Sequence, residues 1–182
     1  MKYTSFAFLD IETTGFACKE HRIVEIGILK SVNRRITEEY SQLINPKRDI
    51  PWSVVSVHGI ENKHVIDAPE IKQVKKKIVE LLGDSLVVTH SSNNFDLHFM
   101  RNELGKDIIF DDRHINFCKL SRRLDKDCSR HSLGAVAGRY NVTIFNQHRA
   151  LGDAKTMYSC FHRMAEKHNI VEVKQILDII NR

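Results

Sequence analysis

The chain has 182 residues, of which 42% are hydrophobic and 28% are charged, with 8 glycines and 3 prolines. This composition is typical of a globular protein large enough to bury its own core, and it excludes a disordered tail, a collagen-like rod and a disulfide-dense miniprotein. The net charge of +5 is compatible with a polyanionic partner but does not identify one.

The N-terminus and the cysteines indicate a protein of the cytoplasm. No apolar run approaches the roughly 18 residues that a membrane-spanning helix needs. Asp10 interrupts the first apolar residues too early for a secretory signal peptide. The 4 cysteines contain no Cys-x-x-Cys pair, so a disulfide framework is not expected. We expect one domain over residues 1–182.

The first third of the chain predicts three strands. Ser5–Ile11 is rich in aromatic and branched apolar residues, which is typical of a strand. Ile23–Val32 and Ile36–Ile44 flank a polar turn, which predicts an antiparallel hairpin. Pro46 and Pro51 bracket a loop after this hairpin.

Helices and short strands alternate in the middle of the chain. A helix is expected to open at Pro69 and to stop at Gly83, and a second helix is expected over residues 94–104. Short apolar runs predict strands at Ser85–Val88 and Ile108–Phe110.

The last third is mostly helical. Helices are expected over Cys118–Leu124, Leu133–Tyr140, Gly152–His168 and Val171–Ile180. A hairpin, then alternating helices and strands, then helices indicates a three-layer α/β/α domain with a mixed sheet of five strands.

Two patterns have an ordinary structural interpretation beside a functional one. The spacing of His114, Cys118, Cys128 and His131 is tolerable for zinc, but zinc sites usually contain tighter cysteine pairs. The lysine run of the first long helix is more typical of a solvated face than of a nucleic-acid site; it comprises Lys72, Lys75, Lys76 and Lys77.

The first candidate functional pattern is the pair Asp10 and Glu12. Because strand side chains alternate between faces, both carboxylates project to the same side. Two like charges at the end of an apolar strand are costly unless a cation neutralises them, and Mg²⁺ or Mn²⁺ suits oxygen ligands. Alone, Asp-x-Glu is more often a solvated strand end.

Two further acidic residues lie at predicted helix starts. Asp96 falls in the first turn of the helix over residues 94–104, where an aspartate commonly interacts with the helix dipole. Asp153 begins a later helix, and His148 precedes it by five residues in a loop. Asp153 and His148 can therefore face one pocket.

Taken together and in this order, Asp10-Ile11-Glu12-Thr13-Thr14-Gly15, Phe95-Asp96 and His148-x-Ala150-x-x-Asp153 resemble the three motifs of the DEDDh 3′–5′ exonuclease family. The resemblance runs from about Tyr3 to Met164. Within the family the chain is most similar to the epsilon proofreading subunit, or exonuclease domain, of bacterial DNA polymerase III. The family has a ribonuclease-H-like fold, so the resemblance implies that fold and a single exonuclease domain.

The resemblance implies a metal-dependent 3′–5′ exonuclease that acts on DNA 3′ ends, preferably single-stranded or frayed, and releases 5′-mononucleotides. Proofreading or repair is the expected role, with a DNA polymerase catalytic subunit as a protein partner and the bacterial cytoplasm as the location. An exoribonuclease that trims RNA ends is the alternative. A catalytically silent nucleic-acid-binding module is disfavoured because all five motif residues are present.

The resemblance also implies roles for these residues with two divalent cations, Mg²⁺ or Mn²⁺. Asp10, Glu12 and Asp153 would hold the nucleophile-side metal. Asp10 would bridge to the second metal, on which Asp96 would act through water. His148 would be the general base, a role that suits a side chain titrating near neutral pH.

Substrate contacts follow from the same resemblance. The small residues after Glu12 would lie beside the terminal nucleotide, a histidine would contact it, and aromatic residues would pack against bases. The implied contacts are Thr13, Thr14, Gly15, Phe16, His58, Asn94, Phe95 and His148. The loop from His90 to Asp96 is one residue longer than the family pattern, which leaves open whether Asn93 or Asn94 replaces the usual asparagine.

Overall fold

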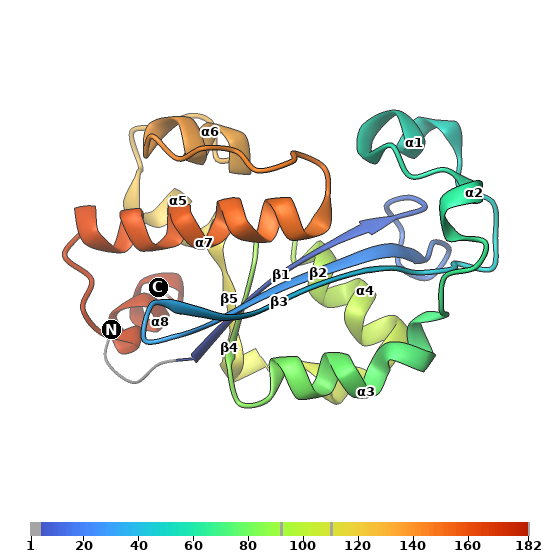
Figure 1. The fold of residues 1–182 in the computed structure, drawn as a ribbon. Helices are drawn as coiled ribbons and strands as arrows, with labels where there is room; N and C mark the ends of the chain where they lie inside the picture. The colour runs from blue at the N-terminus through green and yellow to red at the C-terminus, as the bar shows by residue number, and fades with distance from the viewer. Residues whose placement is uncertain (1–4, 92, 110, 182) are drawn as a thin grey trace.

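The computed structural model describes residues 5–91, 93–109 and 111–181. Its centre is a five-stranded sheet in the order β3-β2-β1-β4-β5 (Figure 1). Strands β1 to β3 pair antiparallel, whereas β4 and β5 continue the sheet in parallel with β1. The strands are β1 (Ser5–Thr13), β2 (Ile23–Val32), β3 (Arg35–Leu43), β4 (Leu86–Thr89) and β5 (His114–Asn116).

Helices cover both faces of the sheet, which confirms the predicted three-layer α/β/α class (Figure 1). α3 and α4 pack on one face, and α5 to α8 contribute to the core on the other. The helices are α1 (Trp52–His58), α2 (Asn62–Val65), α3 (Ile71–Leu82), α4 (Phe95–Leu104), α5 (Phe117–Leu124), α6 (Leu133–Arg139), α7 (Ala150–Lys167) and α8 (Val173–Asn181), with single 3₁₀ turns η1 (Lys106–Ile108) and η2 (Asp111–Arg113).

The alternation of β1 determines which face carries the acidic residues. Phe6 and Phe8 lie in the core that contains α7, whereas Leu9 lies in the opposite core with α3 and α4. Asp10 and Glu12 continue the even-numbered series because the side-chain period of a strand is two. Both carboxylates therefore project toward the face that α7 covers.

Most predicted elements are confirmed, with ends that differ by at most two residues. β1 extends to Thr13, so Glu12 lies within the strand. α1 and α2 were not predicted, because α1 contains three valines that favour strands in isolation. Its helical form is stabilised by packing of Val54 and Val55 against Val24 of β2.

The predicted strand Ile108–Phe110 is wrong. Lys106–Ile108 forms a 3₁₀ turn, and Ile109 is a buried connector whose carbonyl accepts hydrogen bonds from the Arg101 guanidinium at 2.6 and 3.1 Å. Phe110 lies outside the described residues. The fifth strand is instead His114–Asn116, where Ile115 pairs with Val88; its polar flanking residues concealed it in the sequence.

The histidine–cysteine pattern forms an internal hydrogen-bond network. Both ring nitrogens of His131 have partners, Nδ1 with the Ser121 hydroxyl at 2.8 Å and Nε2 with the Cys128 carbonyl at 2.9 Å. His114 Nε2 bonds to the Thr89 hydroxyl at 3.0 Å. His131 thus joins α5 to the loop before α6.

The lysine-rich face of α3 is exposed, and Lys77 pairs with Glu38 of β3 at 3.7 Å.

Within the described residues, no helix combines the length and the apolar character that a bilayer span requires.

Candidate active site

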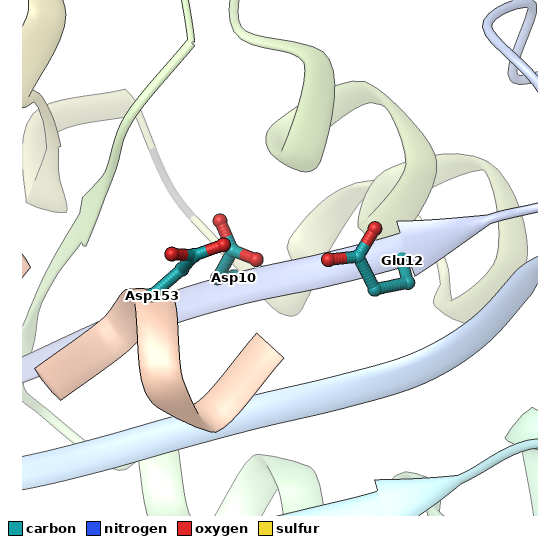
Figure 2. A group of neighbouring side chains, drawn as sticks. All are labelled: Asp10, Glu12 and Asp153. Atoms are coloured by element: carbon teal, nitrogen blue, oxygen red, sulfur yellow. The ribbon is translucent and has the colours of Figure 1, made fainter. Parts of the chain in front are cut away.

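Three carboxylates from distant parts of the chain meet at one point. Asp10 and Glu12 project from β1, and Asp153 lies in the first turn of α7. One oxygen of each lies within 4.8 Å of the others. Figure 2 shows Asp10 and Asp153 facing one another, with Glu12 further along β1. Among the described residues, this is the one group of three or more potential His, Cys, Asp or Glu ligands.

Asp96 lies at the N-terminal turn of α4, next to this group but not within it. Its side chain is 3% exposed, and its Oδ2 atom has no hydrogen-bond partner among the described residues. The negative charge of Asp96 contributes to the raised pKa of Asp10, so the two carboxylates interact. A buried carboxylate oxygen without a partner is costly unless a cation or a water molecule satisfies it.

Burial and mutual repulsion disfavour the charged forms of these carboxyl groups. Burial, reinforced by Asp153 and by the buried Glu25, raises the pKa of Glu12 to about 8. Burial raises the pKa of Asp96 to about 6, and burial followed by the neighbouring acids holds the pKa of Asp10 well above its usual range. Hard oxygen ligands, like charges and the unpartnered Asp96 oxygen together fit a divalent cation.

Divalent metal should stabilise the folded protein. Because Mg²⁺ or Mn²⁺ would neutralise the repelling carboxylates of Asp10, Glu12 and Asp153, millimolar metal should raise Tm by about 5 °C. Differential scanning fluorimetry against NaCl of equal ionic strength measures the shift. An equal shift in Asp10→Asn would contradict a shared site.

The stability of the metal-free protein should fall between pH 6.5 and 8. The folded pKa of Glu12, about 8, exceeds its ordinary value of 4.5, so the folded state binds this proton more tightly and loses that stabilisation as pH rises. Burial lowers the pKa values of His90, His114 and His162 to about 4. Their titration makes stability rise with pH, but only below their ordinary pKa of 6.5, so it does not affect this interval. Tm measured with EDTA across this interval tests the slope, which Glu12→Gln should flatten.

An ion pair between buried Glu25 and exposed Arg149 fixes the start of α7 against β2. Glu25 is 1% exposed and accepts hydrogen bonds from Nε and Nη2 of Arg149 at 2.7 to 3.2 Å. The same carboxylate accepts from the backbone nitrogen of Ala150 at 2.9 Å. The backbones of β2 and α7 also approach closely here, because a Cβ atom added at Gly27 would lie 2.2 Å from the Leu151 backbone nitrogen. Together these contacts hold Asp153 over Asp10.

His148 lies in the exposed loop before α7. Its backbone is left-handed, with φ +61°, and its backbone nitrogen donates to Asp153 Oδ2 at 3.0 Å. The His148 ring interacts electrostatically with both Asp153 and His58, which places it at the margin of the acidic group.

Thr13 ends β1, and the loop that follows it is held by internal hydrogen bonds. Thr13 Oγ1 donates to the Gly15 carbonyl at 2.6 Å, and the buried Thr14 hydroxyl accepts from the Arg22 nitrogen at 3.1 Å. His58 Nδ1 accepts from the Ile60 nitrogen, so Nε2 carries the proton and donates to the Thr13 carbonyl at 3.3 Å. The predicted contacts of this loop and of His58 with a substrate stay predictions.

Phe16 is the exposed aromatic residue at the same end of β1. Its side chain is 85% exposed, and its ring centroid lies 6.5 Å from that of half-buried Phe95, which packs on Phe99 at 4.7 Å. Asn94 precedes α4 in a left-handed conformation, and its Oδ1 accepts from Asn116 Nδ2 at 2.6 Å. In the longer loop, Asn94 is therefore the asparagine fixed at the helix start.

Sequence reasoning did not identify Glu25 or Arg149 as part of the site. A glutamate within the otherwise apolar strand Ile23–Val32 is the pattern that could have identified the first, since a buried charge requires a partner. No local pattern connects it to Arg149, which is 124 residues away in the chain.

Comparison with known proteins supports the interpretation of this geometry. The sequence model of the family RNase_T, described as exonuclease, matches residues 7–161. DNA polymerase III PolC-type of Caldanaerobacter subterraneus subsp. tengcongensis is 31% identical over 96% of the chain, and that of Clostridium perfringens is 32% identical over 94%. The chain spans 12% of the length of each of these relatives.

Solved structures share the fold. Exonuclease X in complex with 5′ overhanging duplex DNA superposes with a TM-score of 0.77 and 25% identity, covering 96% of this chain and 99% of that one. Exonuclease I superposes with a TM-score of 0.79 at 12% identity, covering 96% of this chain and 42% of that one, which shows the fold alone. By its match to the family model over residues 7–161, the chain belongs to the RNase_T family of 3′–5′ exonucleases.

Proposed function

We propose that this chain hydrolyses the 3′-terminal phosphodiester of DNA and releases 5′-mononucleotides, with residues 1–182 acting as one exonuclease domain. The convergence of Asp10, Glu12 and Asp153 within 4.8 Å is the observation that carries the proposal. DNA is favoured over RNA because the relatives are named as DNA polymerases and Exonuclease X was solved with DNA. Single-stranded or frayed ends are the proposed form of the substrate.

We propose that two divalent cations, Mg²⁺ or Mn²⁺, act in the site. Asp10, Glu12 and Asp153 would hold one of them, and Asp10 together with Asp96, through water, would hold the other. When bound, such cations lower the pKa of a coordinated water and offset the charge that develops on the phosphate. The unpartnered Oδ2 atom of Asp96 supports its inclusion.

His148 would accept the proton of the attacking water. Its exposed loop position lets that proton pass on to solvent, and the hydrogen bond from its backbone nitrogen to Asp153 ties the base to a carboxylate of the site. The Arg149–Glu25 pair beside it limits movement of the loop.

The loop of Thr13, Thr14 and Gly15 would border the terminal nucleotide, with His58 and Asn94 beside it. The exposed ring of Phe16 and the half-buried ring of Phe95 would stack on bases. Stacking accepts every base, which suits an enzyme that removes any 3′ nucleotide.

A DNA polymerase catalytic subunit in the bacterial cytoplasm is the proposed protein partner. The relatives that match this chain are themselves named DNA polymerase III PolC-type. Proofreading or repair follows, because either process needs removal of a frayed 3′ nucleotide.

Degradation of matched 5′-labelled single-stranded DNA and RNA, with Mn²⁺ and with EDTA, tests the proposal. A metal-dependent ladder that shortens from the 3′ end of DNA is expected. Faster trimming of RNA would assign the same site to RNA ends. Failure to cut either substrate, although metal still raises Tm, would contradict an exonuclease and leave a binding module.

A further inference from the structure

The acidic group opens into a cleft that continues toward α5 and α6. This cleft has a volume of about 400 Å³. Asp10 and Asp153 line it together with Cys118, Arg122 and Ser132. Arg122 is the arginine of this lining, so two carboxylates and a guanidinium line the same cleft.

Arg122 lies in the cleft because of the pattern of α5. Phe117, Cys118, Leu120 and Ser121 are the buried residues of the helix, which leaves Arg122 on its exposed face. Its guanidinium is close to the Cys118 thiol at the helix start. The helix therefore holds the stem of Arg122 while its charged end faces solvent in the cleft.

Arg122 has no carboxylate within ion-pair distance in the part of the chain that the structure describes. By contrast, Arg101, Arg139 and Arg149 each pair with an acidic side chain at 2.6 to 2.9 Å. A guanidinium matches the oxygen geometry of a phosphate and can bond to it through two parallel hydrogen bonds. An arginine that has no carboxylate partner and lies beside a hydrolytic site is therefore suited to a phosphate.

The position of Arg122 indicates which phosphate it would meet. His58 is the last residue of α1 and bonds to the Thr13 carbonyl, so Thr13 and the loop after it lie beside α1 at the end of β1. α1 and the α5–α6 pair lie on opposite sides of the N-terminal end of α7, which carries Asp153 (Figure 1). A strand whose terminal nucleotide lies toward α1 and whose reacting phosphate lies at Asp10 would leave the site on the side of Arg122.

We propose that Arg122 binds a phosphate on the 5′ side of the scissile bond. It would thereby favour substrates that carry a further phosphate beyond the reacting one. This inference rests on the proposed exonuclease function. Arg122 is a residue of substrate binding, separate from the carboxylates and from His148.

The test compares a short oligothymidylate with thymidine 5′-(p-nitrophenyl phosphate), a diester whose one phosphate is the reacting one. In Arg122→Gln, the ratio of kcat/KM for the oligonucleotide to kcat/KM for the ester should fall about tenfold, mainly through KM. The dependence of log kcat/KM on log salt for the oligonucleotide should become shallower by about 0.7. Arg122→Lys should recover part of the ratio, since the charge remains but the paired bonds do not.

Arg123→Gln is the matched control. Arg123 is the adjacent residue of α5, exposed and of equal charge, but it does not line the cleft. Its ratio should remain that of the parent. An equal fall in Arg123→Gln, or an unchanged ratio in Arg122→Gln with an unchanged Tm, would overturn the proposal. If the parent protein cleaves neither compound, the exonuclease function itself fails, which is a different outcome.

Discussion

Asp153→Asn should reduce turnover of a DNA 3′ end by about a thousandfold or more while the protein stays folded. Asparagine keeps the size of the side chain, and its oxygen can still accept from the His148 nitrogen as Asp153 Oδ2 does at 3.0 Å. What it removes is one of the three negative ligands that lie within 4.8 Å of one another. The loss is therefore one of charge at the reacting centre.

The same substitution should make the metal-free protein no less stable than the parent. Burial and the nearby Glu25 raise the pKa of Asp153, which shows that its charged form is disfavoured in the fold. Neutralisation therefore relieves repulsion, and Tm in EDTA should be equal or higher, while the increase in Tm on adding Mn²⁺ should largely disappear.

Single-turnover rates and melting curves of Asp153→Asn and Asp127→Asn test these expectations together. Asp127 is an exposed aspartate outside the site and provides the same change of charge. More than a tenth of parental turnover in a folded Asp153→Asn would contradict the assignment of the site.

The three carboxylates that meet could be singled out from the sequence because each of them lies in a local pattern. Alternation along β1 places Asp10 and Glu12 on one face, and the apolar stripe of α7 places Asp153 at a helix start. The order of the motifs then implied that these parts meet. Convergence within 4.8 Å is a property of the fold, and neither periodicity nor composition contains it.

The features that the sequence did not predict depend on long-range contacts. β5 is a strand because Ile115 pairs with Val88, although the run His114–Asn116 is mostly polar. Ile109 is buried in the core without belonging to a strand, so a short apolar run could not distinguish the two cases. The partners of Glu25, and the cleft that Arg122 lines with Asp10 and Asp153, likewise follow only from the arrangement of elements far apart in the chain.

Glu25→Ala should lower the free energy of unfolding by about 3 kcal/mol. Glu25 is 1% exposed, and its carboxylate accepts from Arg149 and from the Ala150 nitrogen at the first turn of α7. Removing it leaves these donors without their partner and opens a cavity against β2. This loss of about 3 kcal/mol is at the lower end of the range for removing one partner of a buried ion pair. The reason is that the Arg149 side chain is 48% exposed and can be hydrated once Glu25 is gone.

Glu38→Ala is the matched control on the adjacent strand β3. Glu38 is 46% exposed and pairs with Lys30 and Lys77 at 4.0 and 3.7 Å, so its loss should cost less than about 1 kcal/mol. Urea unfolding midpoints at constant slope measure both values. A Glu25→Ala variant as stable as Glu38→Ala would show that α7 is held by backbone packing at Gly27 alone.

Glu25→Gln separates hydrogen bonding from charge at this position. The amide oxygen can still accept from Ala150 and Arg149, so this variant should keep more of the stability and more of the turnover than Glu25→Ala. Turnover that follows stability across the two variants, with Asp153 unchanged, would mean that the position of α7 sets the geometry of the acidic group. Equal turnover in both, despite different stabilities, would instead mean that Asp153 is positioned by its own helix turn and by the His148 backbone.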